Sequence, residues 1–250
     1  MIFSKEYETL YHDMDASGAV SASHLLKYMQ ETAHLQLLPF GASAEDLRGR
    51  DKEAFWLTRL CIEIVKPLHA YDKIKAETWP SDDSRGFSFN RCFRVLRGEE
   101  TVALAYSVWA LMNLDEMRPV AVRDWNIGLE LEPPVKPSAP IHCRLPKDLE
   151  YIPGGAYKVS YRDIDINGHM NNTNYPDVLC GFLPTQAIKG RGISELTLSY
   201  LHEAPEGSVI EGEYAEDPEE SGTYYIRTYL KASGLVNVES RIRFKNLSDF

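Results

Sequence analysis

An internal repeat constrains the fold of this chain more than any other feature of its sequence. Tyr11 to Val20 runs parallel to Tyr161 to Met170, with a tyrosine, two aspartates and a glycine in the same places. Further along, Leu60 to Val65 corresponds to Leu196 to Leu201. Self-similarity over such distances predicts two copies of one structural unit, stacked or paired in space. A chain of 250 residues with 44% hydrophobic residues is long and apolar enough for this.

Each copy shows a strand-like segment, a polar turn, a helix and then a run of strands. In the first copy the strand covers Lys5 to Tyr11, and apolar residues recur at helical spacing from Leu25 to Leu37. Ser21 or Ser23 can cap this helix, and Pro39 with Gly41 ends it. Alternating apolar and polar residues then predict antiparallel strands over residues 56–64, 72–79, 85–96 and 102–114.

The second copy repeats this order with a shorter helix. Its strand covers residues 156–161, its helix residues 173–182, and its later strands residues 193–201, 208–214, 223–231 and 236–245. Five prolines fall between Leu131 and Pro146, as expected of a linker or strap. The pattern therefore predicts an α+β protein in which each core helix is wrapped by an antiparallel sheet. We expect an N-terminal domain (1–130), a linker (131–150) and a C-terminal domain (151–250).

The polar turn differs between the two copies at the positions that could carry reactive side chains. Residues 163–169 of the second copy hold two carboxylates, an amide, a glycine and an imidazole. Ser17 and Ala19 stand in the first copy where the second has Asn167 and His169. Acid–base groups at the start of a helix lie near unpaired N–H groups and a partial positive charge. A plain helix-capping turn explains the aspartates, but the asymmetry favours a reactive site in the second half.

Charge and targeting signals narrow the class of protein. A formal charge of −10 and a pI near 5.2 argue against a nucleic-acid partner. No apolar run is long enough to span a bilayer, and we see no signal peptide at the start. The four cysteines form no metal-binding or redox pair, which suits free thiols in a reducing cytoplasm.

The motifs resemble those of one enzyme family. Asp165 to Tyr175 is similar to the Asp-x-Asn-x-His-Val-Asn-Asn-x-x-Tyr motif of acyl-ACP thioesterases. The stretches Trp56-Leu-Thr-Arg-Leu, Glu77-Thr-Trp-Pro-Ser and Ser107-Val-Trp-Ala-Leu-Met-Asn also resemble that family's first domain. The resemblance covers nearly the whole chain. It implies a double hotdog fold and hydrolysis of the thioester between a fatty acyl chain and the phosphopantetheine arm of acyl carrier protein, a reaction of fatty acid biosynthesis.

The resemblance also implies site residues. The family's catalytic Asp, Asn and His fall on Asp165, Asn167 and His169, and its Glu-Cys pair falls on Glu203 and Ala204. Because Ala204 replaces the cysteine, a thiol nucleophile at that position is excluded. The lack of a plant-type transit peptide indicates a bacterial-type member. The resemblance implies neither a cofactor nor a metal.

Hydrolysis of a thioester needs an activated water, donors for the oxyanion and a slot for the acyl tail. We expect Glu203 to act as the general base, directly or through Asp165, with Asn167 and His169 positioning the carbonyl and the water. Backbone N–H groups from His169 to Asn171 would hold the oxyanion. The candidate residues for the wall of the slot are Leu25, Met29, Trp56, Phe87 and Trp109. Ordinary core packing also explains each of these five.

A basic face would suit the acidic carrier protein. One candidate is the cluster Arg85, Arg91, Arg94 and Arg97, which a solvated strand face explains equally well. Lys158 and Arg162 lie near the polar turn.

Other functions remain to be weighed. Asp163, Asp165 and Asn167 copy the first half of an EF-hand loop, but Asn174 stands where a bidentate glutamate is required, so we reject calcium binding. Cys180 has no activating histidine in the motif and is a poor candidate for a nucleophile.

An acyl-CoA thioesterase of the same fold is the nearest alternative, and a non-catalytic acyl-binding sensor is the alternative of another class. The sequence leaves chain-length preference and a homodimeric state open.

Overall fold

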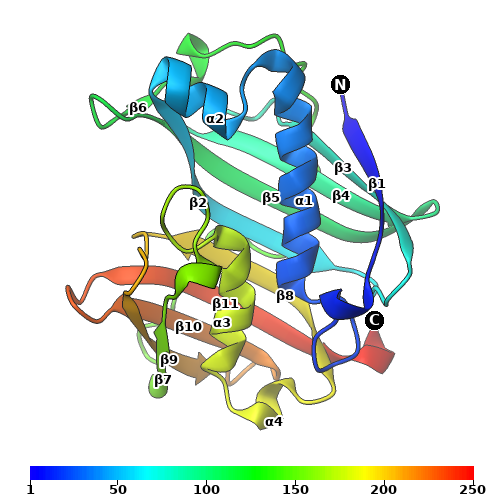
Figure 1. The fold of residues 1–250 in the computed structure, drawn as a ribbon. Helices are drawn as coiled ribbons and strands as arrows, with labels where there is room; N and C mark the ends of the chain where they lie inside the picture. The colour runs from blue at the N-terminus through cyan, green and yellow to red at the C-terminus, as the bar shows by residue number, and fades with distance from the viewer.

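A computed structural model describes residues 1–250, and it shows one curved sheet with its helices on the concave side (Figure 1). The first half contributes six strands: β1 (Phe3–Glu8), β2 (Glu53–Ile64), β3 (Lys73–Pro80), β4 (Phe89–Arg97), β5 (Glu100–Asn113) and β6 (Arg118–Val120). The second half contributes five: β7 (Ile152–Lys158), β8 (Arg191–Tyr200), β9 (Val209–Glu216), β10 (Thr223–Leu230) and β11 (Val236–Asn246).

The strand order shows that the repeat is structural. The main path runs β1-β3-β4-β5-β2-β8-β11-β10-β9-β7, with β6 paired beside β5. The order in the second half mirrors that in the first, and the halves join where β2 pairs antiparallel with β8. Arg59 lies opposite Ser199 and Glu63 opposite Glu195 at this junction. The two predicted units therefore share one continuous hydrogen-bonded sheet.

Each half lays one main helix across its sheet (Figure 1). The first is α1 (Ala22–Leu37), and Ser21 is its N-cap because its side chain accepts the N–H of His24. The second is the shorter α3 (Tyr175–Gly181), which continues a 3₁₀ turn at Asn172–Asn174. Ser23 is not the cap but accepts the N–H of Asp177, which links the starts of the two helices. Two minor helices complete the set, α2 (Ala44–Asp46) and α4 (Thr185–Ile188).

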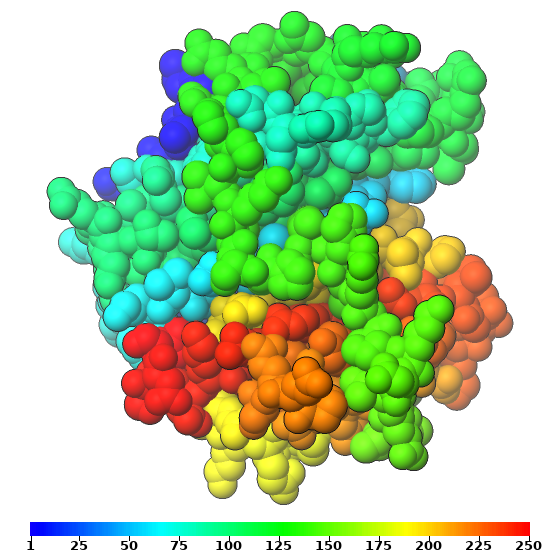
Figure 2. Space-filling model, turned by 180° about the vertical axis from the view of Figure 1, so that it is seen from behind, coloured from blue at the N-terminus to red at the C-terminus, as the bar shows by residue number.

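The proline-rich segment crosses the outer, convex face of the sheet rather than hanging free (Figure 2). Trp79 Nε1 donates to the carbonyl of Pro133 at 3.1 Å, and Thr197 Oγ1 donates to that of Pro140 at 2.7 Å. Ala139 packs with Trp79 in a small apolar cluster on this face. The segment, called the strap below (residues 131–150), thus contacts both halves and covers sheet surface that would otherwise be exposed to water.

The expected strand positions hold to within a few residues, with two exceptions. β4 starts at Phe89 rather than Arg85, because Arg85 and Ser88 close a tight turn in which Gly86 has a φ of +60°. The strand β6 was not expected at all. No helix here has both the length and the apolar character that crossing a bilayer demands.

Candidate active site

The polar turn of the second half is held in shape by Asp163. Its carboxylate accepts the N–H and Oγ–H of Ser160 at 2.8 and 2.7 Å and the hydroxyl of Tyr157 at 2.8 Å. Burial alone would raise the pKa of Asp163, but these hydrogen bonds outweigh burial and hold the pKa below its usual value. Asp13 plays the same part in the first half, where Tyr28 and the N–H of Leu10 donate to it.

Asp165 closes the next turn. One of its carboxylate oxygens accepts the N–H of Asn167 at 2.8 Å, and its own N–H donates to the carbonyl of His169 at 3.0 Å. Asp15 makes the same contact with the N–H of Ser17 at 2.8 Å. The backbone of the turn is therefore the same in both halves. Only the side chains at 167 and 169 distinguish the copy with an amide and an imidazole from the copy without them.

The structure brings Glu203 to this turn. Its Oε1 lies 3.4 Å from Nε2 of His169, whose side chain is 20% exposed while that of Glu203 is 51% exposed. The two segments are fixed together because the N–H of Met170 donates to the carbonyl of Ala204 at 2.9 Å. The imidazole is thus sheltered, and the carboxylate beside it can reach water.

The expected oxyanion donors need a correction. The N–H groups of Met170 and Asn171 already donate to the carbonyls of Ala204 and Asp163, each at 2.9 Å, so they are not free to hold an oxyanion. The side-chain amide of Asn167, by contrast, makes no hydrogen bond within the protein and lies at the cavity described next. Asn172 starts the 3₁₀ turn, where a backbone N–H has no partner within the helix.

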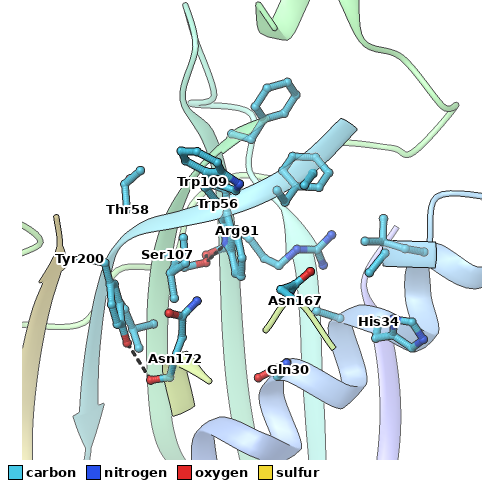
Figure 3. A pocket seen from close by; sticks show the side chains of 18 of the residues that line it. Gln30, His34, Trp56, Thr58, Arg91, Ser107, Trp109, Asn167, Asn172 and Tyr200 are labelled. Carbon is cyan, nitrogen blue, oxygen red and sulfur yellow. Dashed lines mark hydrogen bonds between the residues drawn. The ribbon is translucent and has the colours of Figure 1, made fainter. Parts of the chain in front are cut away.

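A cavity of about 1560 Å³ opens beside the turn and extends into the first half (Figure 3). Its walls come from α1, β2, β4 and β5, together with Val122 to Leu131. Asp165, Asn167, His169 and Glu203 all line it. Tyr161, Ile166 and Leu201 line it as well while being 81%, 73% and 50% exposed, so they mark its mouth.

Three of the five expected wall residues line this cavity and two do not. Met29, Trp56 and Trp109 border it. Leu25 does not line it, because its side chain packs from α1 into the core and is only 2% exposed. Phe87 does not, because it sits in the turn before β4 and is 55% exposed to solvent. The expectation for these two residues is wrong.

Sequence reasoning missed an aromatic group in the wall of the cavity. Phe55, Phe89 and Trp125 stack edge to face with ring centroids 5.2 to 5.5 Å apart. Trp125 follows β6 in a segment without strand or helix periodicity. The only available signal was an isolated tryptophan, which nothing local placed in space.

Two tyrosines lie behind the turn, and sequence reasoning assigned no role to either, although Tyr175 ends the quoted motif. The hydroxyl of Tyr200 donates to the carbonyl of Asn172 at 3.0 Å, and Asn237 donates to the hydroxyl of Tyr175 at 2.9 Å. Their rings meet edge to face at 5.4 Å. Burial raises the pKa of Tyr175 to about 12 and that of Tyr200 well above its usual value, so both hydroxyls remain neutral. Together they hold the start of α3 against the end of β8.

The proposed basic docking cluster is not one surface. Arg94 is bonded to Glu77, and Arg97 to Asp72 and Glu100, so these two charges are already paired. Arg91 points into the protein and is only 9% exposed. Residues on a strand alternate between faces, and this separates Arg91 from its neighbours.

Two family models match the chain. The acyl-ACP thioesterase N-terminal domain matches residues 1–127, and the acyl-ACP thioesterase C-terminal domain matches residues 149–246. A chloroplastic acyl-[acyl-carrier-protein] hydrolase of Cuphea viscosissima is 26% identical over 235 residues, which are 88% of this chain and 56% of that protein. A palmitoyl-acyl carrier protein thioesterase of Arabidopsis thaliana is 24% identical over 84% of this chain and 54% of its own length. The chain thus spans about half the length of these curated relatives.

Solved structures share the fold. An acyl-ACP thioesterase from Bacteroides thetaiotaomicron superposes with a TM-score of 0.84 at 22% identity, covering 98% of both chains. The 12:0-ACP thioesterase from Umbellularia californica gives a TM-score of 0.81 at 16% identity, covering 98% of this chain and 97% of the other. The predicted α+β double hotdog fold is confirmed.

Proposed function

The chain belongs to the acyl-ACP thioesterase family, and from that premise we propose that it hydrolyses the thioester of fatty acyl-acyl carrier protein. The products are a free fatty acid and carrier protein with a free phosphopantetheine thiol. One observation supports this most: the His169–Glu203 pair lies at the mouth of an apolar cavity large enough for an acyl chain. Its volume of about 1560 Å³ exceeds the usual range for a small-molecule pocket.

In this proposal Glu203 is the general base. His169 Nε2 lies 3.4 Å from one carboxylate oxygen and would donate to it in the reacting complex, while the other oxygen takes a proton from a water molecule as that water attacks the thioester carbon. The Asn167 side-chain amide donates to the oxyanion that forms. The C–S bond then breaks, and the proton held by Glu203 passes to the leaving thiolate. Asp165 keeps Asn167 in place through its hydrogen bond to the backbone.

Replacing the base tests this scheme. Glu203→Gln keeps the shape of the side chain but cannot take a proton, so we expect kcat to fall by about 10²–10⁴. Asn167→Ala is expected to lower kcat by about 10²–10³, the usual cost of losing one oxyanion donor. The measurement is steady-state release of free thiol from acyl-ACP, with thermal unfolding of each variant recorded alongside.

The matched control is Glu206→Gln, which removes an exposed carboxylate three positions further on that does not line the cavity. It is expected to retain full turnover. Undiminished turnover in the Glu203 variant at unchanged folding stability would remove Glu203 from the mechanism. Asp165→Asn then becomes the decisive variant, because Asp165 is the other carboxylate at the turn.

Carrier protein rather than coenzyme A is the proposed acyl donor, and three arginines at the cavity support this. Arg48, Arg123 and Arg162 line the cavity and are exposed, the last two by 87% and 83% of their side chains. Arg123 and Arg162 contact the carboxylates of Asp124 and Asp163 at 3.5 and 3.7 Å but leave most of the guanidinium open to solvent. An acidic helix of the carrier protein would be steered to them. No second copy of this chain is needed, because the sheet already joins two hotdog units. The four cysteines are free thiols, as suits the cytoplasm.

Reversing these charges distinguishes the two donors. Arg123→Glu together with Arg162→Glu should raise KM for acyl-ACP about tenfold or more, weaken its salt dependence, and leave short acyl-pantetheine substrates unaffected. Lys147→Glu, in the strap on the opposite face, is the control. An acyl-CoA thioesterase would instead cleave acyl-CoA at least as fast as acyl-ACP. A non-catalytic sensor would bind acyl chains and release no thiol from either.

A further inference from the structure

One wall residue of the acyl cavity carries a charge that no carboxylate balances. Arg91 on β4 is 9% exposed and lines the cavity. Its Nη1 donates to Gln36 Oε1 at 2.6 Å and to Thr78 Oγ1 at 3.0 Å. Its Nε and Nη2 make no hydrogen bond within the protein, and Figure 3 shows the side chain reaching from the sheet into the space beside α1. Buried guanidinium groups normally have a paired anion.

The position of Arg91 makes it an end wall. The mouth, marked by the exposed Tyr161, Ile166 and Leu201, lies beside the end of β8, the strand that pairs with β2. From there the lining crosses β2, β5 and β4, but the next strand, β3, contributes only Pro80. With strands about 4.8 Å apart, Arg91 lies roughly two strand spacings beyond β2. Gln36 and Thr78, which hold it, are outside the lining.

A charge at the end of an apolar slot discriminates between acyl chains that end in a methyl group and acyl chains that end in a polar group. Burial lowers the pKa of Arg91 to about 10, so the guanidinium stays charged at neutral pH. A methyl group pressed against its free N–H groups displaces water without replacing the hydrogen bonds, and that costs free energy. A hydroxyl or carbonyl oxygen at the same place would accept from those donors instead.

We propose that Arg91 is the polar end of the acyl slot and sets the longest unsubstituted acyl chain that the site accepts. Chains that stop short of the guanidinium bind along apolar walls. Longer chains are rejected unless their far end carries a hydrogen-bond acceptor. This inference rests on the proposed thioesterase function, because it concerns the same cavity.

The test compares wild type with Arg91→Met on a series of saturated acyl-ACP substrates of increasing length. In wild type, kcat/KM should rise with length and then fall at one length. In the variant the fall should shift to longer chains, with about tenfold recovery at the first rejected length, since a buried methylene contributes about fourfold in affinity. An ω-hydroxy chain of that length should be cleaved about tenfold better than its unsubstituted counterpart by wild type, and worse by the variant.

Structural effects are controlled by Thr78→Val and Gln36→Met. Each removes a partner of Arg91 without altering a residue that lines the cavity, so stability should fall while the length profile stays the same. Arg91→Lys keeps the charge and should keep the cut-off, which gives a second variant if the methionine form does not fold. A length profile of Arg91→Met that superimposes on that of wild type would overturn the proposal.

A binding measurement separates this proposal from the hydrolysis itself. Calorimetry on wild-type protein with non-hydrolysable amide analogues of acyl-pantetheine should show the same cut-off and the same preference for an ω-hydroxyl group. Failure of wild type to cleave any acyl-ACP would reject the proposed function, while this titration would still report on Arg91. Equal affinity for plain and ω-hydroxy chains at every length would reject the role of Arg91.

Discussion

At the scale of single residues, two aspartates in one turn have separate tasks. Asp163 is 6% exposed and accepts three hydrogen bonds, and its counterpart Asp13 is buried although the turn of the first half has Ala19 where the second has His169. Asp165 lines the cavity and accepts only the N–H of Asn167. The first aspartate therefore stabilises the turn, and the second belongs to the site that the turn presents.

The stabilising role of Asp163 predicts a pH-dependent effect. Asp163→Asn should lower the free energy of unfolding by about 1–3 kcal/mol near neutral pH, since it weakens hydrogen bonds to a buried charge. The pKa of Asp163 is lowered in the folded state from its ordinary value of 3.8. Its stabilisation is therefore complete above the ordinary value and is lost as pH falls through the folded one.

Urea unfolding of both forms from about pH 3 to pH 7 measures this difference. The gap between wild type and variant should be constant above about pH 5 and close at the acid end. Asp148→Asn, an exposed carboxylate in the strap, should show no gap at any pH. A gap that stays the same down to the lowest pH would contradict the role given to the Asp163 charge.

At the scale of elements, α3 sits close to its sheet because two glycines make room for Phe182. A Cβ on Gly212 of β9 would lie 2.6 Å from the ring of Phe182, and one on Gly154 of β7 would lie 2.6 Å from the carbonyl oxygen of Phe182. Phe182 is 4% exposed and follows the last turn of α3. The close approach fixes the helix whose first turn carries the polar site.

Gly212→Ala should therefore destabilise the protein by about 1–3 kcal/mol through overpacking. Phe182→Leu in the same chain should recover part of the loss, because it removes the ring that the new methyl group meets. Gly181→Ala is the control: a Cβ there meets nothing within 4 Å, and the change is expected to be neutral or slightly stabilising. Thermal unfolding of wild type and the three variants measures these stabilities. Equal losses of stability for the substitutions at 181 and 212 would contradict overpacking against Phe182.

Element positions could largely be predicted from the sequence, whereas the facing of individual side chains could not. The strands and α1 could be predicted because the period of two and the helical spacing from Leu25 to Leu37 are local signals, and the internal repeat supported both; the cap was narrowed only to Ser21 or Ser23. The wall of the cavity depends on which face a residue presents, and pairing shifts between Leu57 and Arg59 and between Val95 and Leu96 alter that facing. Phe87 was misplaced because it lies in the turn before β4, and Arg91 because it faces the interior of the protein. Trp125 lies in a segment whose apolar residues show neither helical nor strand periodicity.

The site itself divides in the same way. The motif placed Asp165, Asn167 and His169 in one turn, since they are neighbours in the chain. Glu203 was placed beside them through a resemblance, and the structure now gives the 3.4 Å contact. The N–H groups expected to hold the oxyanion were wrong at Met170 and Asn171. Their acceptors, the carbonyls of Ala204 and Asp163, are set by tertiary packing and leave no trace in the local sequence.

At the scale of the whole molecule, the β2–β8 junction makes the two halves one cooperative unit. The strap also hydrogen-bonds to both halves, and Ser23 on α1 contacts Asp177 on α3. Isolating either half would expose the edge of β2 or β8, and an open edge strand is prone to aggregation. We therefore expect a single unfolding transition.

The chain offers a convenient pair of probes for this prediction. All four tryptophans lie in the first half, so tryptophan fluorescence reports on that half alone. Amide hydrogen exchange of β10 and β11 reports on the second half. Their unfolding midpoints in denaturant should coincide within error. Two well-separated midpoints would show that the junction does not couple the halves.

Most of the cavity wall comes from the first half of the chain, whereas the polar turn comes from the second, and this arrangement has an evolutionary consequence. In a symmetric pair of identical units, every mutation in a pocket wall is present twice and also alters the unit that supplies the reactive groups. Here a mutation in α1 or β4 is inherited once and leaves the other half untouched. Under the proposed function, natural selection can therefore alter the preferred acyl chain in one half while the residues around His169 in the other stay constant.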